Sequence, residues 1–233
     1  MAIIKFKCEW EAKLFIKSHA LKLVGSGSEG TCYRGKDKKV YKCLNIDRRY
    51  PYDVDKIITE EDVKLDSFAF PDELYTVDDG LIGYRTDYVK GNYFSVDNTA
   101  DIENIIDLDF EKLATAYKKM LEDIKLLSKE KILVYDLPFN VMFDGEKMTA
   151  IDTCAYKRVK KNPLEENITS LNKAIEMVFT MWFMDYKDIS YKIEGTNIKD
   201  YLDKIINALP QDLFMRRIIR MMEKDTEKQK VKQ

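Results

Sequence analysis

Residues 21–46 read LKLVGSGSEGTCYRGKDKKVYKCLNI, and this stretch decides the fold of the first half of the chain. Apolar and polar residues alternate in three short runs, which are separated by two turn signals, GSGSEG at 25–30 and GKDKK at 35–39. Alternation with a period of two is typical of half-buried strands, and tight glycine-rich or charged connections join strands into hairpins. The stretch therefore predicts three consecutive antiparallel strands.

The sequence on both sides of this stretch extends the β-rich region. Before the stretch, we expect a short strand at residues 3–10 and two helical turns at 11–18. After it, we expect a polar and moderately helical segment at 53–64. Two strands that turn at Asp78-Asp79-Gly80 should follow at 68–89. The first half should thus be mostly β, with about five strands and one helix.

The second half has a helical pattern instead. Helices are expected at residues 109–130, 167–186 and 197–224. Asp109 is a plausible N-cap of the first helix, and Pro210 should divide the last region into two helices. The expected fold class is α+β, with a small antiparallel β lobe at 1–89, a reduced helical lobe at 90–224 and a tail at 225–233.

Composition excludes several classes of protein. The chain has 233 residues, of which 45% are hydrophobic and 34% charged, and its formal net charge is −2. This length suits one large domain or two small lobes. A nucleic-acid-binding protein usually carries a basic excess, so no nucleic acid is expected as a partner. The chain has no apolar run of 18 residues, so no membrane span is expected either.

The cysteines and the single histidine limit the chemistry further. Cys8, Cys32, Cys43 and Cys154 are scattered without CxxC spacing, and the start MAIIKFKCEW lacks the apolar core of a signal peptide. We therefore expect reduced, buried thiols and a cytoplasmic protein. Because His19 is the only histidine, a His-based triad or a multi-His metal site cannot be built easily.

Gly25, Gly27 and Gly30 form a GxGxxG pattern with two interpretations. The glycines could serve only a hairpin turn. Alternatively, their backbone N–H groups could cover the phosphates of a nucleotide, since no Cβ obstructs the approach. A strand-like run follows the pattern, which disfavours a Rossmann fold, and the pattern is not that of a Walker loop.

Lys42 lies among apolar residues in the run VYKCL. Burying an ammonium group without a partner is costly, so a lysine in a central strand needs a reason. It could be an edge-strand lysine that points outward, as we expect of Lys38 and Lys39. It could also be a cation below the glycine-rich segment that holds phosphate oxygens.

Residues 134–153, VYDLPFNVMFDGEKMTAIDT, place polar residues at the ends of two short strands joined by a tight turn. The polar residues are Asp136, Asn140 and Asp152. They could be the polar ends of a surface hairpin. They could also form a metal-and-phosphate site, because carboxylate and amide oxygens suit Mg²⁺.

In this order, the motifs resemble those of the protein-kinase-like superfamily, and the chain is similar to its compact, divergent bacterial-type Ser/Thr kinases and kinase-like proteins. The resemblance covers roughly residues 20–185. GSGSEG resembles the nucleotide-covering loop, VYK the strand with the phosphate-binding lysine, YDLPFNVMFD the catalytic loop, and AIDT the metal-binding segment. TDYVKG resembles the hinge between the lobes, with Thr86 at the gatekeeper position and Asp87 to Val89 facing adenine.

The resemblance implies an ATP- and Mg²⁺-dependent kinase that transfers phosphate to a Ser/Thr hydroxyl. Asp136 would accept the proton of the attacking hydroxyl, and Asn140 and Asp152 would bind Mg²⁺. Lys42 would pair with the α- and β-phosphates below the glycine-rich segment. A kinase helix also offers a glutamate to this lysine, and Glu61, or else its neighbour Glu60, lies at a plausible distance; a solvated acidic helix face is the alternative.

Departures from the kinase pattern keep two other functions open. Val134-Tyr135 replaces the usual His-Arg before Asp136, and Asp152-Thr153-Cys154 lacks the usual glycine. These replacements favour a pseudokinase, in which the fold is a binding module. The short segment after Asp152 favours a small-molecule kinase of the aminoglycoside or choline type. The substrate is accordingly a protein or a small-molecule acceptor.

Two basic segments and the tryptophans complete the candidates. The run from Lys157 to Lys161 could attract an acidic substrate, although a solvated loop is the simpler interpretation. The segment MRRIIRMMEK near the C-terminus could dock a partner protein or a membrane surface, or form a terminal helix. Trp10 and Trp182 are expected in the core.

Overall fold

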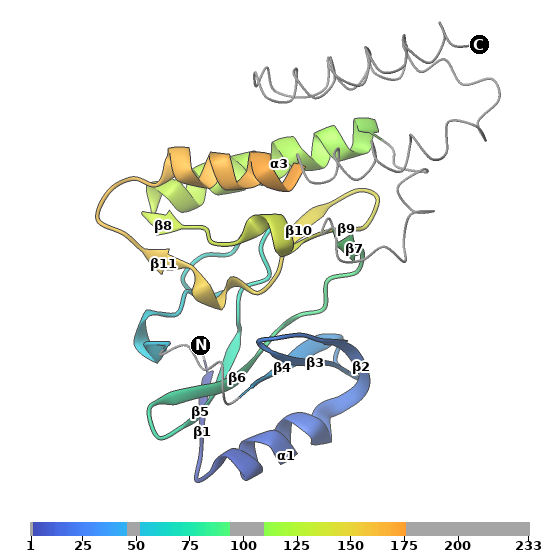
Figure 1. Cartoon of the computed structure of the whole chain (residues 1–233), viewed down its shortest axis with the longest axis vertical. Helices are drawn as coiled ribbons and strands as arrows, with labels where there is room; N and C mark the ends of the chain where they lie inside the picture. Colours follow the sequence, from blue (N-terminus) through green and yellow to red (C-terminus); the bar gives the residue numbers. More distant parts are fainter. Residues whose placement is uncertain (1, 46–51, 94–109, 176–233) are drawn as a thin grey trace, which may run out of the picture. The chain divides into compact units, whose positions relative to one another are not determined.

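The computed structural model describes residues 2–45, 52–93 and 110–175 (Figure 1). The chain folds into two compact units. The first unit is Met1–Lys90 with Asp123–Tyr135 and Thr149–Asn167. The second unit consists of residues 91–122, 136–148 and the chain from 168 onward. The expected division into lobes at 1–89 and 90–224 stays a prediction, and the tail at 225–233 lies outside the described residues.

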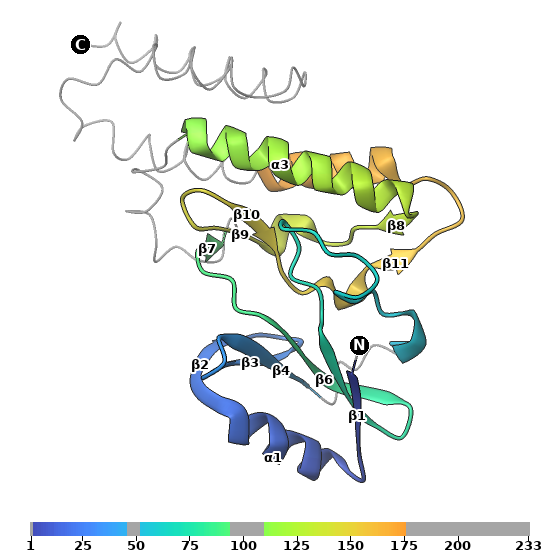
Figure 2. The same ribbon diagram turned by 180° about the vertical axis from the view of Figure 1, so that it is seen from behind.

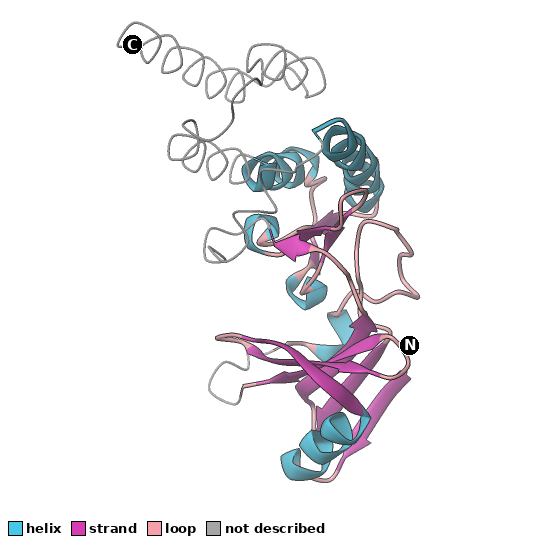
Figure 3. Cartoon of the chain, turned by 90° about the vertical axis from the view of Figure 1, so that its right-hand side faces the viewer, coloured by secondary structure: helices cyan, strands magenta, loops and turns pink. Residues whose placement is uncertain are grey.

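A six-stranded sheet forms the first unit's framework (Figures 1 and 3). Its strands are β1 (Ala2–Phe6), β2 (Ala20–Ser26), β3 (Gly30–Gly35), β4 (Lys39–Leu44), β5 (Glu73–Val77) and β6 (Gly80–Asp87). They are arranged in the order β1-β5-β6-β4-β3-β2. Only the β1–β5 pairing is parallel, and the other pairings are antiparallel. The three strands predicted within 21–46 and the two predicted within 68–89 are confirmed.

Helix α1 (Glu9–His19) packs on one face of this sheet, as both Figure 1 and the reverse view in Figure 2 show. Its buried residues Ala12 and Ile16 are four positions apart, so they lie on the same side of the helix. Ile16 packs with Tyr41 of β4 and Tyr75 of β5 in one hydrophobic cluster. The helix thus covers the sheet face to which Tyr41 points.

The opposite face of the sheet carries a second hydrophobic cluster. Leu44, Leu74 and Tyr84 from three strands pack there with Ile57 and Cys154. Successive side chains of a strand point to opposite faces, so Lys42 shares this second face with Leu44, while Tyr41 faces α1. The face that carries Lys42 is therefore covered by segments of the same unit, among them the one that contains Cys154.

Backbone hydrogen bonds join the segment around Phe68 to the segment around Ala150. Phe68 forms a parallel bridge with Ala150, and the Ala69 and Ala150 amides donate to the carbonyls of Ala150 and Ser67, each over 2.9 Å. The Thr153 hydroxyl donates to the Ala69 carbonyl over 3.1 Å. These bonds place the segment around Asp152 next to the chain that leads into β5.

The remaining described elements follow β6. They are β7 (Asn92–Tyr93), α3 (Phe110–Lys129), β8 (Ile132–Leu133), β9 (Val141–Phe143), β10 (Met148–Ala150) and β11 (Lys157–Arg158), with 3₁₀ turns η4 (Leu137–Phe139) and η5 (Thr153–Ala155). The strands β10, β9 and β7 form one small sheet, and β11 pairs with β8 in another. A helix also covers residues 164–175.

The helical predictions for the second half are confirmed where they can be compared. The helix expected at 109–130 is α3, and its expected N-cap Asp109 lies outside the described residues. The helix expected at 167–186 begins earlier, at residue 164, and is described as far as 175. The helices expected at 197–224, including MRRIIRMMEK, and Trp182 lie outside the described residues.

Several expectations were wrong. Residues 53–64 do not form a helix, because only the single 3₁₀ turn η2 (Val54–Lys56) is helical there, and Ile57 and Ile58 instead bury their side chains. Trp10 belongs to α1 and not to a strand, and it is 71% exposed. Cys8 is exposed, whereas Cys154 is buried as expected. Across the described residues, no helix has the length and apolarity that a membrane crossing requires.

Candidate functional site

Lys42 lies in the interior of the six-stranded sheet and not at its edge. Its strand β4 is flanked by β3 and β6, on which Cys32 and Tyr84 lie opposite Lys42. Only 6% of Lys42 is exposed. The interpretation of Lys42 as an outward-pointing edge lysine is therefore wrong, and its ammonium group must be stabilised by partners within the fold.

Two carboxylates supply that stabilisation. Asp152 Oδ1 lies 2.5 Å from Lys42 Nζ, and Glu29 Oε2 lies 3.2 Å from it. The Tyr84 hydroxyl donates a second hydrogen bond to Asp152 Oδ1, over 2.6 Å. Lys42 and Asp152 are 110 residues apart in the sequence. Folding of the first unit thus brings together two residues that the order of the motifs predicts to share one site.

The electrostatics keep Lys42 and Asp152 charged. Burial lowers the pKa of Lys42, but the neighbouring Asp152 charge and hydrogen bond outweigh burial, so the pKa of Lys42 is raised. Burial raises the pKa of Asp152, but Lys42 and the Tyr84 hydrogen bond outweigh this effect, so the pKa of Asp152 is lowered. Both groups are therefore ionised at neutral pH.

Burial raises the pKa values of the acidic groups around this pair. Burial and the nearby Asp152 charge raise the pKa of Glu29. Burial raises the pKa of the Cys32 thiol to about 11, and it also raises the pKa of the Cys154 thiol. Both cysteines are therefore protonated thiols at neutral pH, and neither has the character of a reactive thiolate.

Asp152 and Asp136 occupy the same unusual local structure. Asp152 has φ 59° and ψ 42°, Asp136 has φ 57° and ψ 31°, and each is followed at once by a 3₁₀ turn. Residues other than glycine rarely adopt this left-handed conformation, and it clusters at functional sites. Lys38, Asp78 and Lys131 also have positive φ, but they lie between strands or just after a helix, where turns commonly need it.

The Asp136–Asn140 segment is held by its own backbone. The Phe139 amide donates to the Asp136 carbonyl over 3.3 Å, and the Asn140 amide donates to the Leu137 carbonyl over 3.0 Å. Asn140 Nδ2 also donates to the Asp136 carbonyl over 3.2 Å. One 3₁₀ turn thus accounts for the spacing of four residues. Asp136 and Asn140 belong to the second compact unit, whereas Asp152 belongs to the first.

The glycine-rich segment is a tight strand-to-strand turn, as expected. The Gly27 amide donates to the Gly30 carbonyl over 2.9 Å. Asn45, just after β4, holds the turn from the side: its amide donates to the Glu29 carbonyl over 2.8 Å, and its Nδ2 donates to the Gly27 and Ser28 carbonyls over 3.3 and 3.2 Å. The backbone of the turn, including that of Glu29, is therefore held by the residue that follows β4.

One of the three glycines has a steric reason to be glycine within the described residues. A Cβ at Gly30 would lie 2.3 Å from the Cys43 carbonyl oxygen, so the pairing of β3 with β4 requires glycine there. A Cβ at Gly25 or Gly27 would meet no atom of the described residues within 4 Å. The pairing of strands within the sheet therefore explains Gly30 but not the other two.

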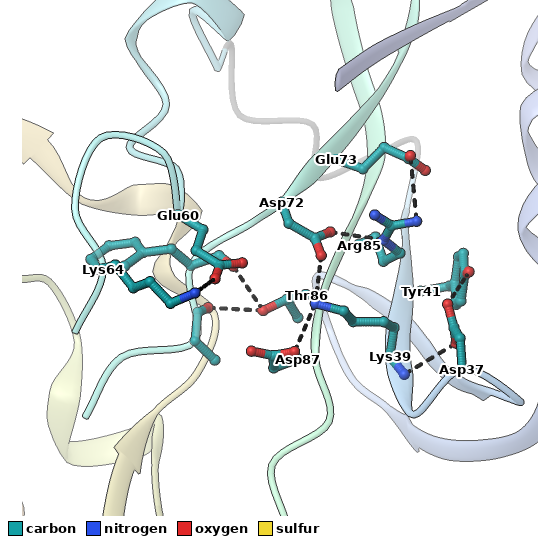
Figure 4. A network of polar contacts seen from close by, with 12 residues as sticks. Asp37, Lys39, Tyr41, Glu60, Lys64, Asp72, Glu73, Arg85, Thr86 and Asp87 are labelled. Carbon is teal, nitrogen blue, oxygen red and sulfur yellow. Dashed lines mark hydrogen bonds and ion pairs between the residues drawn. The ribbon is translucent and has the colours of Figure 1, made fainter. Parts of the chain in front are cut away.

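The predicted hinge residues lie at the end of β6, in a polar network (Figure 4). The buried Thr86 hydroxyl donates to the Ala69 and Phe70 carbonyls over 3.0 and 3.1 Å. Asp87 is 64% exposed at its side chain and lies 2.7 Å from Lys39. Val89 is partly exposed just beyond the strand. These hydrogen bonds and the ion pair fix Thr86 and Asp87 in place.

The network continues along the edge of the same strands (Figure 4). Lys39 also pairs with Asp72 over 2.6 Å, and Asp72 accepts a hydrogen bond from Arg85 over 2.8 Å. Arg85 lies 3.4 Å from Glu73. The alternating charges tie β4 and β6 to the start of β5, so this network is structural support for the predicted hinge.

The helix that was expected to carry the acidic partner of Lys42 requires a correction. Glu60 and Glu61 lie in a turn and not on a helix, and Glu60 lies 3.0 Å from Lys64. Within the described residues, the carboxylates paired with Lys42 come from Glu29 and Asp152. Sequence reasoning missed Glu29, Tyr84 and Asn45. Glu29 had a visible signal, because it is the one charged residue within GSGSEG, whereas the other two had none.

The donor set for a metal is limited. Among the residues that the structure describes, no three His, Cys, Asp or Glu side chains converge on one point. Asp152, Asn140 and Glu29 carry the kind of oxygen ligand that Mg²⁺ prefers, and Mg²⁺ usually takes one or two carboxylates together with substrate phosphates and waters. A converging cluster of three is therefore not required for a nucleotide-bound Mg²⁺.

A scan against protein-family models found no match for this chain, and a search of curated proteins found none either.

Proposed function

We propose that this chain is an ATP- and Mg²⁺-dependent phosphotransferase with a two-lobed, protein-kinase-like fold, and that it phosphorylates Ser/Thr hydroxyls of proteins. One observation carries the proposal. The resemblance assigns Lys42 and Asp152 to one nucleotide site, and their charged groups lie 2.5 Å apart. A buried lysine beside an aspartate brings together two of the groups that this chemistry uses, a cation for the phosphates and a carboxylate for Mg²⁺.

Phosphoryl transfer depends mainly on positioning and on neutralising charge. Lys42 is charged at neutral pH and would neutralise the α- and β-phosphates. Gly25 and Gly27 leave open space above the turn, which supports a close approach of phosphate to the backbone. Asp152 and Asn140 are the residues proposed to hold Mg²⁺, which would neutralise charge on the transferred group.

Asp136 is proposed as the base that accepts the proton of the attacking hydroxyl. Its side chain is exposed, as a group that meets an acceptor must be. Its left-handed backbone conformation is followed by a turn that buries Leu137, which anchors the segment on its inner side. Geometry of this kind, maintained at some conformational cost, supports a functional role for the residue.

The first prediction tests transfer directly, by intact-mass spectrometry of the 233-residue chain incubated with Mg·ATP and a generic basic protein. Wild type should add about 80 Da per phosphoryl group to itself or to that protein. Asp136→Ala should add none, because the attacking hydroxyl loses its base. Asp79→Ala is a matched control, since Asp79 is an exposed aspartate of the β5–β6 turn, and it should behave as wild type.

Two results would contradict the proposal. Equal mass gain in wild type and in Asp136→Ala would mean that Asp136 is not the base. An absence of gain in wild type would contradict phosphorylation of proteins. Wild type and Asp136→Ala would then be assayed for ATP consumption with aminoglycoside and choline acceptors, which separates a small-molecule kinase from a pseudokinase.

A further inference from the structure

Glu29 extends from the glycine-rich turn to the ammonium group of Lys42. The turn lies between β2 and β3, and Glu29 Oε2 is 3.2 Å from Lys42 Nζ. The glutamate side chain is 38% exposed, whereas the lysine side chain is 8% exposed. The acidic side chain of an exposed turn thus contacts a buried ammonium group. In the proposed function, phosphate oxygens contact this same cation.

The two carboxylates around Lys42 are not equivalent. Asp152 is bound at 2.5 Å, accepts a second hydrogen bond from Tyr84, and is connected to the packed segment around Thr153 and Cys154. Glu29 is bound at the longer distance of 3.2 Å and belongs to a turn whose outer side is open. If one carboxylate leaves Lys42, Glu29 is therefore the one that can move.

The local charge favours such a departure when a phosphate ligand binds. Two carboxylates and one ammonium give the cluster an excess of one negative charge when all three are ionised. An ammonium group has three N–H donors, and Glu29 and Asp152 together occupy two of them. A triphosphate that approaches Lys42 would meet a like charge and a partly occupied donor.

We propose that Glu29 is an internal anion that holds Lys42 in the absence of nucleotide and is displaced by the phosphate oxygens of a magnesium nucleoside triphosphate. This inference rests on the proposed function and adds that the Glu29 carboxylate competes with phosphate for Lys42. A carboxylate oxygen and a phosphate oxygen accept the same charge-assisted hydrogen bond from an ammonium group. The carboxylate of Glu29 would thus take the place of a phosphate oxygen at Lys42 until a nucleotide binds.

The test compares the dissociation constants of Mg·ATP and adenosine for wild type and Glu29→Gln, measured by isothermal titration calorimetry on the 233-residue chain. Glutamine keeps the shape of the side chain but removes its charge. The Kd of Mg·ATP should fall about tenfold, which is the order expected when one nearby like charge is removed. The Kd of adenosine should not change, because adenosine carries no phosphate.

Two further variants make the test specific. Glu9→Gln removes a glutamate that also pairs with a lysine, Lys13, but on α1, which covers the other face of the sheet, so it should bind Mg·ATP as wild type does. Glu29→Asp keeps the charge but withdraws the carboxylate by one methylene group. It should also tighten Mg·ATP binding, by less than Glu29→Gln, and it provides a second measurement if the glutamine variant folds poorly.

The outcomes separate the inference from the proposed function. If wild type and Glu29→Gln bind Mg·ATP equally well, or the variant binds it more weakly while adenosine binding is unchanged, nucleotide binding stands and displacement of Glu29 is overturned. Weaker binding would make Glu29 a permanent positioning partner of Lys42. If wild type binds neither Mg·ATP nor adenosine, the proposed function itself fails, and the inference fails with it.

Discussion

Lys42 is the single residue at which burial and chemistry are most closely linked. Its ammonium group is withdrawn from water, and Asp152 and Glu29 are the groups that make this tolerable. A buried pair contributes little beyond what a well-packed apolar pair would, but removing one partner leaves an uncompensated charge in the interior. The burial of this pair is therefore not explained by stability alone.

The second prediction concerns the removal of this lysine. Lys42→Met should lower the free energy of unfolding by about 3 kcal/mol at pH 8, because two carboxylates then face one another without a cation. Urea denaturation followed by circular dichroism measures the loss. Lys64→Met is the control, since Lys64 is largely exposed in its ion pair with Glu60, and it should change stability by less than about 1 kcal/mol.

The loss caused by Lys42→Met should depend on pH, with a definite sign. In wild type the folded-state pKa of Asp152 is lowered, so its contribution to stability is present above the unfolded-state pKa and is lost as pH falls through the folded-state value. Without Lys42, burial raises that pKa instead, and protonation then relieves the folded state. The difference between wild type and variant should thus shrink from pH 8 towards pH 4; a difference that grows would contradict this account.

At the scale of elements, the glycines around the β2–β3 turn differ in their surroundings. Gly30 allows β3 to approach the backbone of β4, whereas Gly25 and Gly27 face open space. Asn45 then fixes the turn with three hydrogen bonds from the end of β4. The same GxGxxG pattern thus contains one position that the sheet requires and two positions whose glycine the described fold leaves unexplained.

The third prediction separates these two kinds of glycine. Gly30→Ala should lower the free energy of unfolding by about 2 kcal/mol, because the new methyl group would overlap the Cys43 carbonyl oxygen. Gly27→Ala should unfold at nearly the wild-type urea concentration but bind Mg·ATP more weakly. Both quantities are measured on the same preparations. Unchanged nucleotide affinity in Gly27→Ala would mean that the turn does not approach the phosphates.

At the scale of the whole molecule, the first compact unit is assembled from three separate stretches of chain. Residues 149–167 return to the face of the sheet that carries Lys42, and Cys154 joins the same hydrophobic cluster as Leu44 and Tyr84. The bridge and hydrogen bonds around Phe68 and Ala150 hold this returning segment. The position of Asp152 is therefore a result of packing between segments that lie far apart in the sequence.

The fourth prediction follows from binding linkage in the complete chain. A ligand that binds only the folded state stabilises it, by about 2.7 kcal/mol at a hundred times its Kd. ATP should raise the Tm of wild type more with Mg²⁺ than without it. Asp152→Asn and Asn140→Ala should each remove this Mg²⁺-dependent increment, because each removes a proposed oxygen ligand or its charge. Differential scanning fluorimetry measures the shifts.

Asp62→Asn is the control for this experiment, since Asp62 is partly exposed and forms a 3.5 Å pair with Arg158. It should retain the full increment. An increment that persists in both Asp152→Asn and Asn140→Ala would show that the metal is held elsewhere. If wild type shows no difference between ATP with and without Mg²⁺, the assignment of a metal site in this chain is wrong.

Local patterns in the sequence were sufficient for most of the described secondary structure. Alternating apolar residues and turn signals predicted β2, β3 and β4, and helical spacing predicted α3, because period and turn chemistry are properties of neighbouring residues. The segment 53–64 was misassigned because its polar, helix-compatible composition does not reveal that Ile57 and Ile58 are buried by tertiary packing. Trp10 was misplaced for the converse reason, since hydrophobicity alone does not show which side of a helix faces the sheet.

The candidate site was likewise predictable only in part. The sequence by itself determined which residue types were available, and the order of its motifs indicated that Lys42 and Asp152 serve one site. Only the tertiary structure decided that Lys42 is buried, that Tyr84 supports Asp152, and that Glu29 faces the ammonium group. The physical reason is that an ion pair depends on distance and burial in three dimensions, and spacing along the chain does not encode either quantity.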